Sequence, residues 1–267
     1  MSPRRAIAWL LLAASFAVAL QLLRWSEAAG DPVLSLALAS ASVEFMLASL
    51  AFVLALLAPG SPRERLGLLP ARLGPAPTAL LALGTLGLSH ALDALLELSG
   101  LYEQSALADF ARSVQGARGL PLLAATLSIG LLPAVGEELL CRGLLQRSLL
   151  PRVGAAGAIA IAALAFGALH LEPVHASFAV LLGAYLGVAG YWSGSVLTPI
   201  LCHAVNNLFA LAISVQSGPT ADASPGDVAA GLLLAFAALA WTSRWRPRPA
   251  PGPPRPALQP TPGSDDG

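Results

Sequence analysis

The sequence predicts an all-α fold, a polytopic membrane helix bundle, on three grounds. The 267 residues have a mean hydropathy of +0.71 and only 11% of them are charged, whereas ordinary soluble proteins have roughly 25% charged residues. Uncharged runs of about twenty residues recur, and one such run can cross the ~30 Å hydrocarbon core of a bilayer. The formal net charge is zero, so no basic field would attract nucleic acid. The expected partner is the lipid bilayer.

The apolar runs predict about eight transmembrane helices. The first run fits either a spanning helix or a secretory signal, and its length favours the helix because signal cores are ~7–15 residues long. The connection at residues 59–77 contains five prolines, which should prevent a helix from continuing through it. The eight runs are residues 6–23, 33–58, 78–98, 120–150, 153–171, 177–192, 196–215 and 228–241.

Two segments are not expected to span the membrane. Residues 99–119 are more polar, with apolar residues at helical spacing, which indicates a helix at the membrane interface. The proline-rich tail cannot bury enough apolar surface to fold, and is predicted to be disordered. The chain therefore divides into N-terminal helices with an interfacial helix (1–119), a core of spans four to seven (120–216), a last transmembrane helix (217–243) and the tail (244–267).

The arginines are distributed unevenly over the connections between spans. Cytoplasmic loops collect positive charge, and with a cytoplasmic N-terminus only Arg24, Arg112 and Arg118 would lie outside. We therefore expect both termini in the cytoplasm. The absence of lysine, together with abundant Ala, Leu, Gly and Pro, indicates a GC-rich bacterial genome. The predicted location is the bacterial inner membrane.

Ionisable residues cluster within three of the apolar runs. Each costs at least ~2.5–3.5 kcal/mol on insertion scales, so a cluster is a functional hypothesis by default. In the fourth run Glu138 and Arg142 are four residues apart on one helix face, where they can neutralise each other. This pair either fixes helix packing or takes a direct part in catalysis. Glu137 is rotated ~100° from Glu138 and is the carboxylate left for reaction.

The helix register predicts that these clusters meet at one depth. Spans four and five should form an antiparallel hairpin turning near residues 151–154, and Glu137 and His170 are each about 16 residues from residue 153. His203 and Asn207 lie one helical turn apart on the seventh span. We expect the three helices to converge around one site.

The residue types in this site point to hydrolysis of an amide bond by water. A carboxylate beside imidazoles can take a proton from water, and a histidine with an asparagine amide can stabilise the resulting oxyanion. A serine mechanism has less support, because no serine lies in a Gly-x-Ser-x-Gly turn. The sequence also lacks the zinc motif His-Glu-x-x-His.

Three short patterns carry a resemblance to a known family: Glu-Glu-x-x-x-Arg, Phe-x-x-x-His and His-x-x-x-Asn, each on its own apolar span. They occur at Glu137, Glu138 and Arg142, at Phe166 and His170, and at His203 and Asn207. In their order, spacing and placement, these motifs resemble those of the CAAX-protease and bacteriocin-processing family of intramembrane proteases. That family includes the type II prenyl-protein endopeptidases.

The resemblance implies a role for each matching residue. Water would be activated by Glu137 and His170, the oxyanion would be stabilised by His203 and Asn207, and the supporting residues would be Glu138, Arg142 and Phe166. The implied substrate is a membrane-associated protein or peptide, cut near its C-terminus. We assign no cofactor, because one carboxylate, two imidazoles and an amide make a poor zinc set. If zinc is bound, its ligands would be Glu137, His170 and His203.

A second class of function stays open: a non-catalytic membrane scaffold or a proton-coupled transporter that uses the same buried polar layer. Transporters commonly have internal repeats with interrupted helices in matching places. No repeat relates the two halves of this chain, which favours the enzyme. No role is assigned to Glu44, alone in the second span, or to His90, Asp93 and Glu97, which follow one another at i, i+3 and i+7 on the third.

Overall fold

The computed structural model describes residues 3–219 and 222–245, and every regular element in those residues is helical. The all-α prediction is confirmed. The disordered tail predicted for residues 244–267 lies outside the described residues beyond Trp245. The elements are α1 (Pro3–Ala28), α2 (Pro32–Leu57), α3 (Pro62–Arg65), α4 (Pro75–Leu98), η1 (Tyr102–Gln104), α5 (Ala106–Val114), α6 (Gly119–Ala125), η2 (Thr126–Leu131), α7 (Leu132–Glu138), η3 (Leu139–Gln146), α8 (Arg147–Ala168), α9 (Pro173–Ser193), α10 (Leu197–Ser217) and α11 (Pro225–Thr242).

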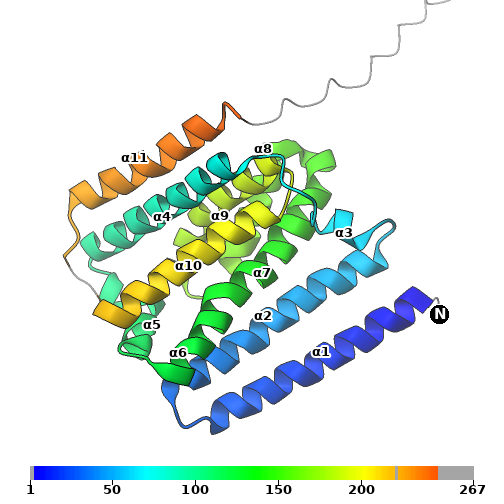
Figure 1. Ribbon diagram of the computed structural model, residues 1–267, viewed down its shortest axis with the longest axis horizontal. Coiled ribbons are helices and arrows are strands. Elements are labelled where there is room, and N and C mark those ends of the chain that lie inside the picture. The colour runs from blue at the N-terminus through cyan, green and yellow to red at the C-terminus, as the bar shows by residue number, and fades with distance from the viewer. Residues whose placement is uncertain (1–2, 220–221, 246–267) are drawn as a thin grey trace, which may run out of the picture.

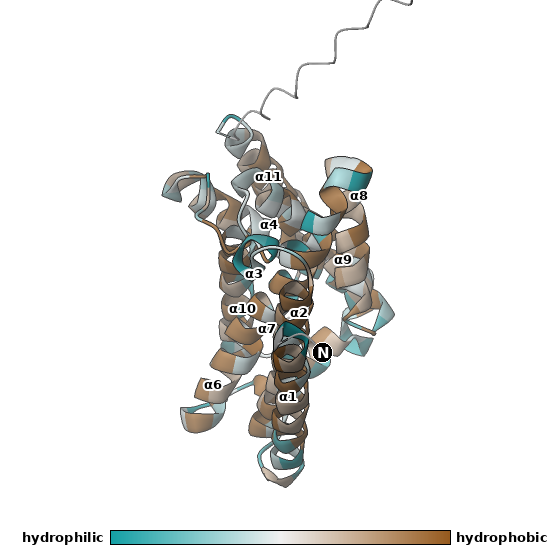
Figure 2. Cartoon of the chain, turned by 90° about the vertical axis from the view of Figure 1, so that its right-hand side faces the viewer, coloured by the Kyte–Doolittle hydropathy of each residue, from teal (hydrophilic) through white to brown (hydrophobic). Residues whose placement is uncertain are grey.

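Seven helices in the described residues are long and apolar enough to cross a membrane, which confirms the polytopic bundle. The predicted spans four and five lie within one 50-residue helical stretch, Gly119–Ala168. That stretch breaks at Gly154, whose φ of 71° and ψ of 179° are non-helical and are readily adopted only by glycine. Figure 2 shows hydrophobic residues along the helices and hydrophilic residues gathered mainly near their ends.

The bundle is arranged around α10, which contacts α4, α7 and α9. In Figure 1, α1 lies at one edge and packs against α2, whereas α11 covers α4 at the opposite edge. Glycine allows the close contact between α4 and α11, because a Cβ at Gly87 would lie 2.8 Å from the carbonyl oxygen of Gly231. Small residues at such contacts let membrane helices approach closely.

The beginning of α1 and the end of α11 lie at the same end of the bundle, together with α3 (Figure 1). We call this the arginine-rich end, because it collects most arginines of the connections. The opposite end, formed by η1, α5 and the connection before α11, is called the distal end. The arginines near the arginine-rich end are Arg4, Arg5, Arg63, Arg65, Arg72, Arg147, Arg152 and Arg244.

Polar side chains fix several helix ends, as local capping rules require. The Asp31 side chain accepts a hydrogen bond from the Leu34 N–H at 2.9 Å at the start of α2.

In the interfacial segment, Arg112 on α5 donates to Asp109 at 2.9 Å and to Glu103 at 2.8 Å. These two hydrogen bonds raise the pKa of the Arg112 guanidinium above its ordinary value. The segment stays a short helix beside the bundle and does not span it.

Candidate active site

A cavity of about 640 Å³ extends from the middle of the bundle to the distal end, between α2, α4, α7, α9 and α10. Residues of η1, α5 and the connection before α11 line its outer part. Glu138 and Arg142 lie behind its inner wall. The other five motif residues line the cavity: Glu137, Phe166, His170, His203 and Asn207.

Glu137 belongs to α7, a short α-helical piece between the π-helical turns η2 and η3. Such turns are frequent at functional sites, and here neighbouring helices bond to the carbonyl groups of η2. The Ser40 hydroxyl donates to the Ser128 carbonyl at 2.8 Å, and the Asn207 amide donates to the Ile129 carbonyl at 3.4 Å. An asparagine amide has two N–H donors, so Asn207 keeps one for the cavity.

Glu138 and Arg142 form a buried ion pair behind the cavity. Their closest N–O distance is 2.9 Å, and their side chains are 0% and 1% exposed. Arg142 also donates to the Gly183 carbonyl on α9 at 2.7 Å, and its guanidinium lies 4.3 Å from the centroid of the Phe166 ring. The pair expected from the i, i+4 spacing is therefore present, and it joins η3 to α9.

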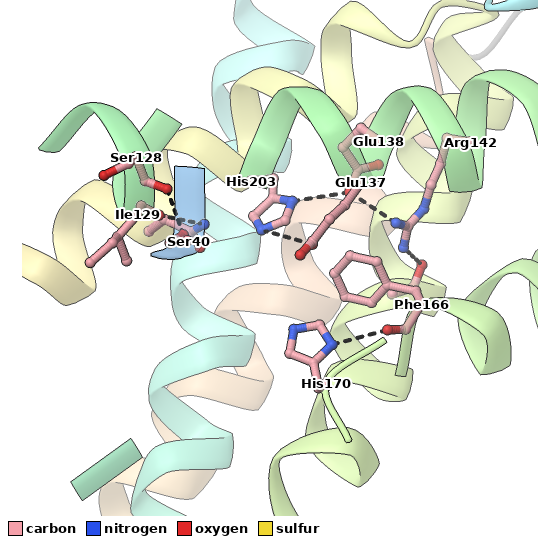
Figure 3. Close-up of polar contacts among 11 residues, drawn as sticks. Ser40, Ser128, Ile129, Glu137, Glu138, Arg142, Phe166, His170 and His203 are labelled. Atoms are coloured by element: carbon pink, nitrogen blue, oxygen red, sulfur yellow. Dashed lines mark hydrogen bonds and ion pairs between the residues drawn. The ribbon is translucent and has the colours of Figure 1, made fainter. Parts of the chain in front are cut away.

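His203 lies between the two glutamates (Figure 3). Its Nδ1 is 3.1 Å from Glu138 Oε1, and its Nε2 is 3.9 Å from Glu137 Oε2. Because the Glu138 carboxylate is paired with Arg142, it accepts the proton of Nδ1. In the neutral imidazole, Nε2 then faces Glu137 without a proton. The Oε2 atom of Glu137 accepts no hydrogen bond from any described residue.

Phe166 separates the two imidazoles of the site. Its ring centroid is 5.1 Å from that of His170 and 5.7 Å from that of His203. The Nδ1 atom of His170 is 3.0 Å from the Phe166 carbonyl oxygen, and the His175 ring lies edge-on to His170 with centroids 4.4 Å apart. The structure therefore puts His203 against Glu137, and His170 on the other side of the Phe166 ring (Figure 3).

The three sequence motifs leave out Glu44, His175 and Asn206, which also line this cavity. Glu44 on α2 is 6% exposed, and its Oε2 lies 2.9 Å from the position that a Cβ on Gly136 would occupy. It is close enough for its charge to act on Glu137. The sequence does contain a signal for Glu44. It is the one ionisable residue in the second apolar run, and a carboxylate inside the membrane is costly, so it is a functional hypothesis by default.

The face of α4 that carries His90, Asp93 and Glu97 lines the outer part of the cavity. His90 Nε2 is 3.6 Å from Asp227 Oδ1, and Glu97 accepts a hydrogen bond from the Ala223 N–H at 3.1 Å. These contacts hold the start of α11 and the residues before it against α4. The polar stripe on the third predicted span therefore lies on the path from the distal end to Glu137.

The arrangement does not fit a metal ion. No group of three or more His, Cys, Asp or Glu side chains in the described residues could hold one. Within the zinc set named from the sequence, His203 faces carboxylates with both ring nitrogens, and His170 places its Nδ1 on a backbone carbonyl. We therefore derive no catalytic step through a metal.

The fold and the site define an integral membrane protein whose helices enclose a carboxylate, imidazoles and amides in one cavity. Residues 119–209, about a third of the chain, match the family model described as type II CAAX prenyl endopeptidase Rce1-like. The matched segment contains all three motifs, and the resemblance predicted from them is confirmed. Over these residues the chain is similar to the type II endopeptidases of the CAAX-protease and bacteriocin-processing family. No curated protein and no solved structure matches the chain.

Proposed function

We propose that this protein is an intramembrane endopeptidase. Its substrate would be a membrane-tethered, lipidated or signal-bearing protein or peptide, cleaved near its C-terminus by water. The observation that carries the proposal is the Glu137 carboxylate, which faces the cavity beside His203 with an oxygen that no described residue hydrogen-bonds. A buried polar atom without a partner is costly, and a water molecule is a suitable partner for it.

Glu137 would act as the general base. It takes a proton from a cavity water bound at its Oε2 atom, while the water oxygen attacks the carbonyl carbon of the substrate. His170 lines the same cavity beyond the Phe166 ring. The proton then passes from Glu137 to the amine nitrogen as the C–N bond breaks. A general base of this kind typically contributes ~10²–10⁴-fold to the rate.

Asn207 and His203 would stabilise the oxyanion of the tetrahedral intermediate. Asn207 has an amide N–H left after its bond to the Ile129 carbonyl. His203 would donate from Nε2 once that nitrogen carries a proton. Removing one oxyanion donor typically costs ~10²–10³-fold in kcat. Glu138, held by Arg142, would orient the His203 ring and act as a positioning residue.

The proposed setting is the bacterial inner membrane with both termini in the cytoplasm. The clustering of arginines at one end of the bundle supports this orientation through the positive-inside rule. The outer part of the cavity would then lie on the side of the membrane away from the cytoplasm. Reporter domains fused after residue 245 and at Gln115 test this orientation, because only the reporter at Gln115 should be exported across the membrane.

Comparison of protein C-termini tests the proposed activity directly. Membrane proteomes are compared from cells with the gene, without the gene, and with the Glu137→Gln gene. We expect a set of C-termini that appears only with the parent gene, since the amide keeps the side-chain shape but not its basicity. Identical C-termini in all three strains would reject the protease and favour the scaffold or transporter.

A further inference from the structure

A second cavity, of about 500 Å³, lies at the arginine-rich end and is lined by four arginines. Arg65 comes from α3, Arg72 from the connection before α4, Arg147 from the start of α8 and Arg142 from η3. Glu64 is the one acidic residue in the lining. Among the described residues no carboxylate forms an ion pair with Arg65, Arg72 or Arg147.

Two of these arginines are held around one glycine. Gly194 ends α9 with a φ of 66°, and a Cβ there would lie 3.0 Å from Arg72 Nε. Arg147 donates to the Gly194 carbonyl at 3.3 Å, while its Cδ lies 3.0 Å from where a Cβ on Gly67 would be. The two guanidinium groups thus both lie beside Gly194, where their like charges repel each other. The backbone thus holds two cations together without a described counter-charge.

Arg142 provides an independent observation in the same cavity. It is 2% exposed, and its two terminal nitrogens are bonded to Glu138 and to the Gly183 carbonyl. Its Nε, however, has no hydrogen-bond partner among the described residues. An unpaired buried N–H on a charged group is costly, and this unused donor belongs to a residue in the wall of the cavity, beside the unpaired charges.

We propose that this cavity binds a phosphate group between Arg72 and Arg147, with Arg65 beside it. The forked guanidinium groups match the several acceptor oxygens of phosphate, and a bound anion would offset the repulsion between the two arginines. The phosphate can belong to an anionic lipid headgroup, because basic pockets between transmembrane helices bind such headgroups, or to a soluble phosphate. The site is separate from the Glu137 cavity, and phosphate binding there does not depend on the proposed protease activity.

Binding is measured on the full chain in nanodiscs of zwitterionic lipid. One series adds increasing phosphatidylglycerol and the other adds inorganic phosphate, and the melting temperature is the readout. A melting temperature raised by phosphatidylglycerol alone assigns the site to a lipid headgroup. A melting temperature raised by inorganic phosphate assigns it to a soluble phosphate. The parent response should weaken as salt is raised.

The variants decide whether the response comes from this cavity. Each arginine removed should weaken binding about fivefold, given the contribution of one basic residue near an anionic headgroup. Arg72→Gln is the first variant, since its guanidinium makes no hydrogen bond within the described residues; Arg72→Gln with Arg147→Gln is the second. Arg152→Gln is the matched control, because Arg152 is exposed on the same helix as Arg147 and outside the cavity lining.

The Glu137→Gln protein should bind like the parent, which keeps this result independent of the proposed protease activity. If Arg72→Gln and the double variant respond like the parent to both phosphatidylglycerol and inorganic phosphate, the proposal is wrong. A loss of response as large in Arg152→Gln as in Arg72→Gln would also overturn it, because general surface charge would then explain the effect.

Discussion

The carboxylate of Glu138 holds the imidazole of His203, with 3.1 Å between Oε1 and Nδ1 across 65 residues of sequence. The same oxygen accepts a hydrogen bond from Arg142 at 2.9 Å. Glu138 therefore links the first motif to the third, and its charge is balanced within its own helix. Glu137, its neighbour in sequence, has no such partner among the described residues. The two adjacent glutamates should respond differently to the same substitution.

Glu137→Gln should abolish cleavage and leave the protein folded. The amide has nearly the same shape but cannot take a proton from water, so the rate should fall by ~10²–10⁴-fold. Cleavage of an identified substrate and the melting temperature in detergent are measured together. Glu27→Gln, at an exposed position near the end of α1, is the control and should change neither. Retained cleavage in Glu137→Gln would contradict the general-base role.

Glu138→Gln should act mainly on stability. It leaves the Arg142 charge buried without its partner, and breaking a buried pair this way costs ~3–5 kcal/mol. Adding Arg142→Gln should recover part of that loss, because the one charge left unpaired is then removed as well. Unfolding in denaturant checks both variants. A Glu138→Gln protein as stable as the parent but inactive would assign Glu138 to catalysis.

Gly183→Ala should disturb the wall of the active site from α9. Its Cβ would lie 3.0 Å from Phe166 Cδ1 and 3.1 Å from an Arg142 nitrogen, and overpacking of this kind costs ~1–3 kcal/mol. Gly190→Ala is the matched control on the same helix, since its Cβ would meet Pro199 and Arg142 only at 3.4 Å or more. We expect reduced stability and cleavage for the first variant alone. Equal effects would show that α9 tolerates no added methyl group on this face.

Cleavage should survive a strong chelator, and active protein should contain well under one zinc per chain. The reason is the geometry of the donors, since His203 and His170 already direct ring nitrogens at Glu138 and at the Phe166 carbonyl. Metal analysis of the purified protein is combined with cleavage before and after chelation. Stoichiometric zinc whose removal stops cleavage and whose return restores it would make Glu137, His170 and His203 ligands.

The parts of the site that follow helix periodicity could be predicted from the sequence. Glu138 and Arg142, four residues apart, form the expected ion pair. The break in Gly119–Ala168 falls at Gly154, at the edge of the turn expected at residues 151–154. Both relationships are local, because they depend on the geometry of one helix or of one hairpin.

The contacts between distant helices could not be predicted in the same way. Glu44 lies beside Gly136, more than ninety positions later in the chain, and periodicity within α2 does not say which helix will pack against it. The π-helical turns around α7 also have no local signal, because Ser40 and Asn207 bond to the carbonyls of η2 from other helices.

The break at Gly154 leaves the second arm of α8 only residues 155–168 long. Fourteen helical residues rise about 21 Å, which is less than the ~30 Å hydrocarbon thickness. The helix should therefore end within the membrane, and the turn with His170 should lie there too. Non-helical backbone at such depth is tolerated only inside protein or beside a water-filled cavity, and His170 lines the cavity at Glu137. The shortened helix thus puts a non-helical turn beside the cavity, where water can bond to its backbone, and the same water would be the second substrate of the proposed hydrolysis.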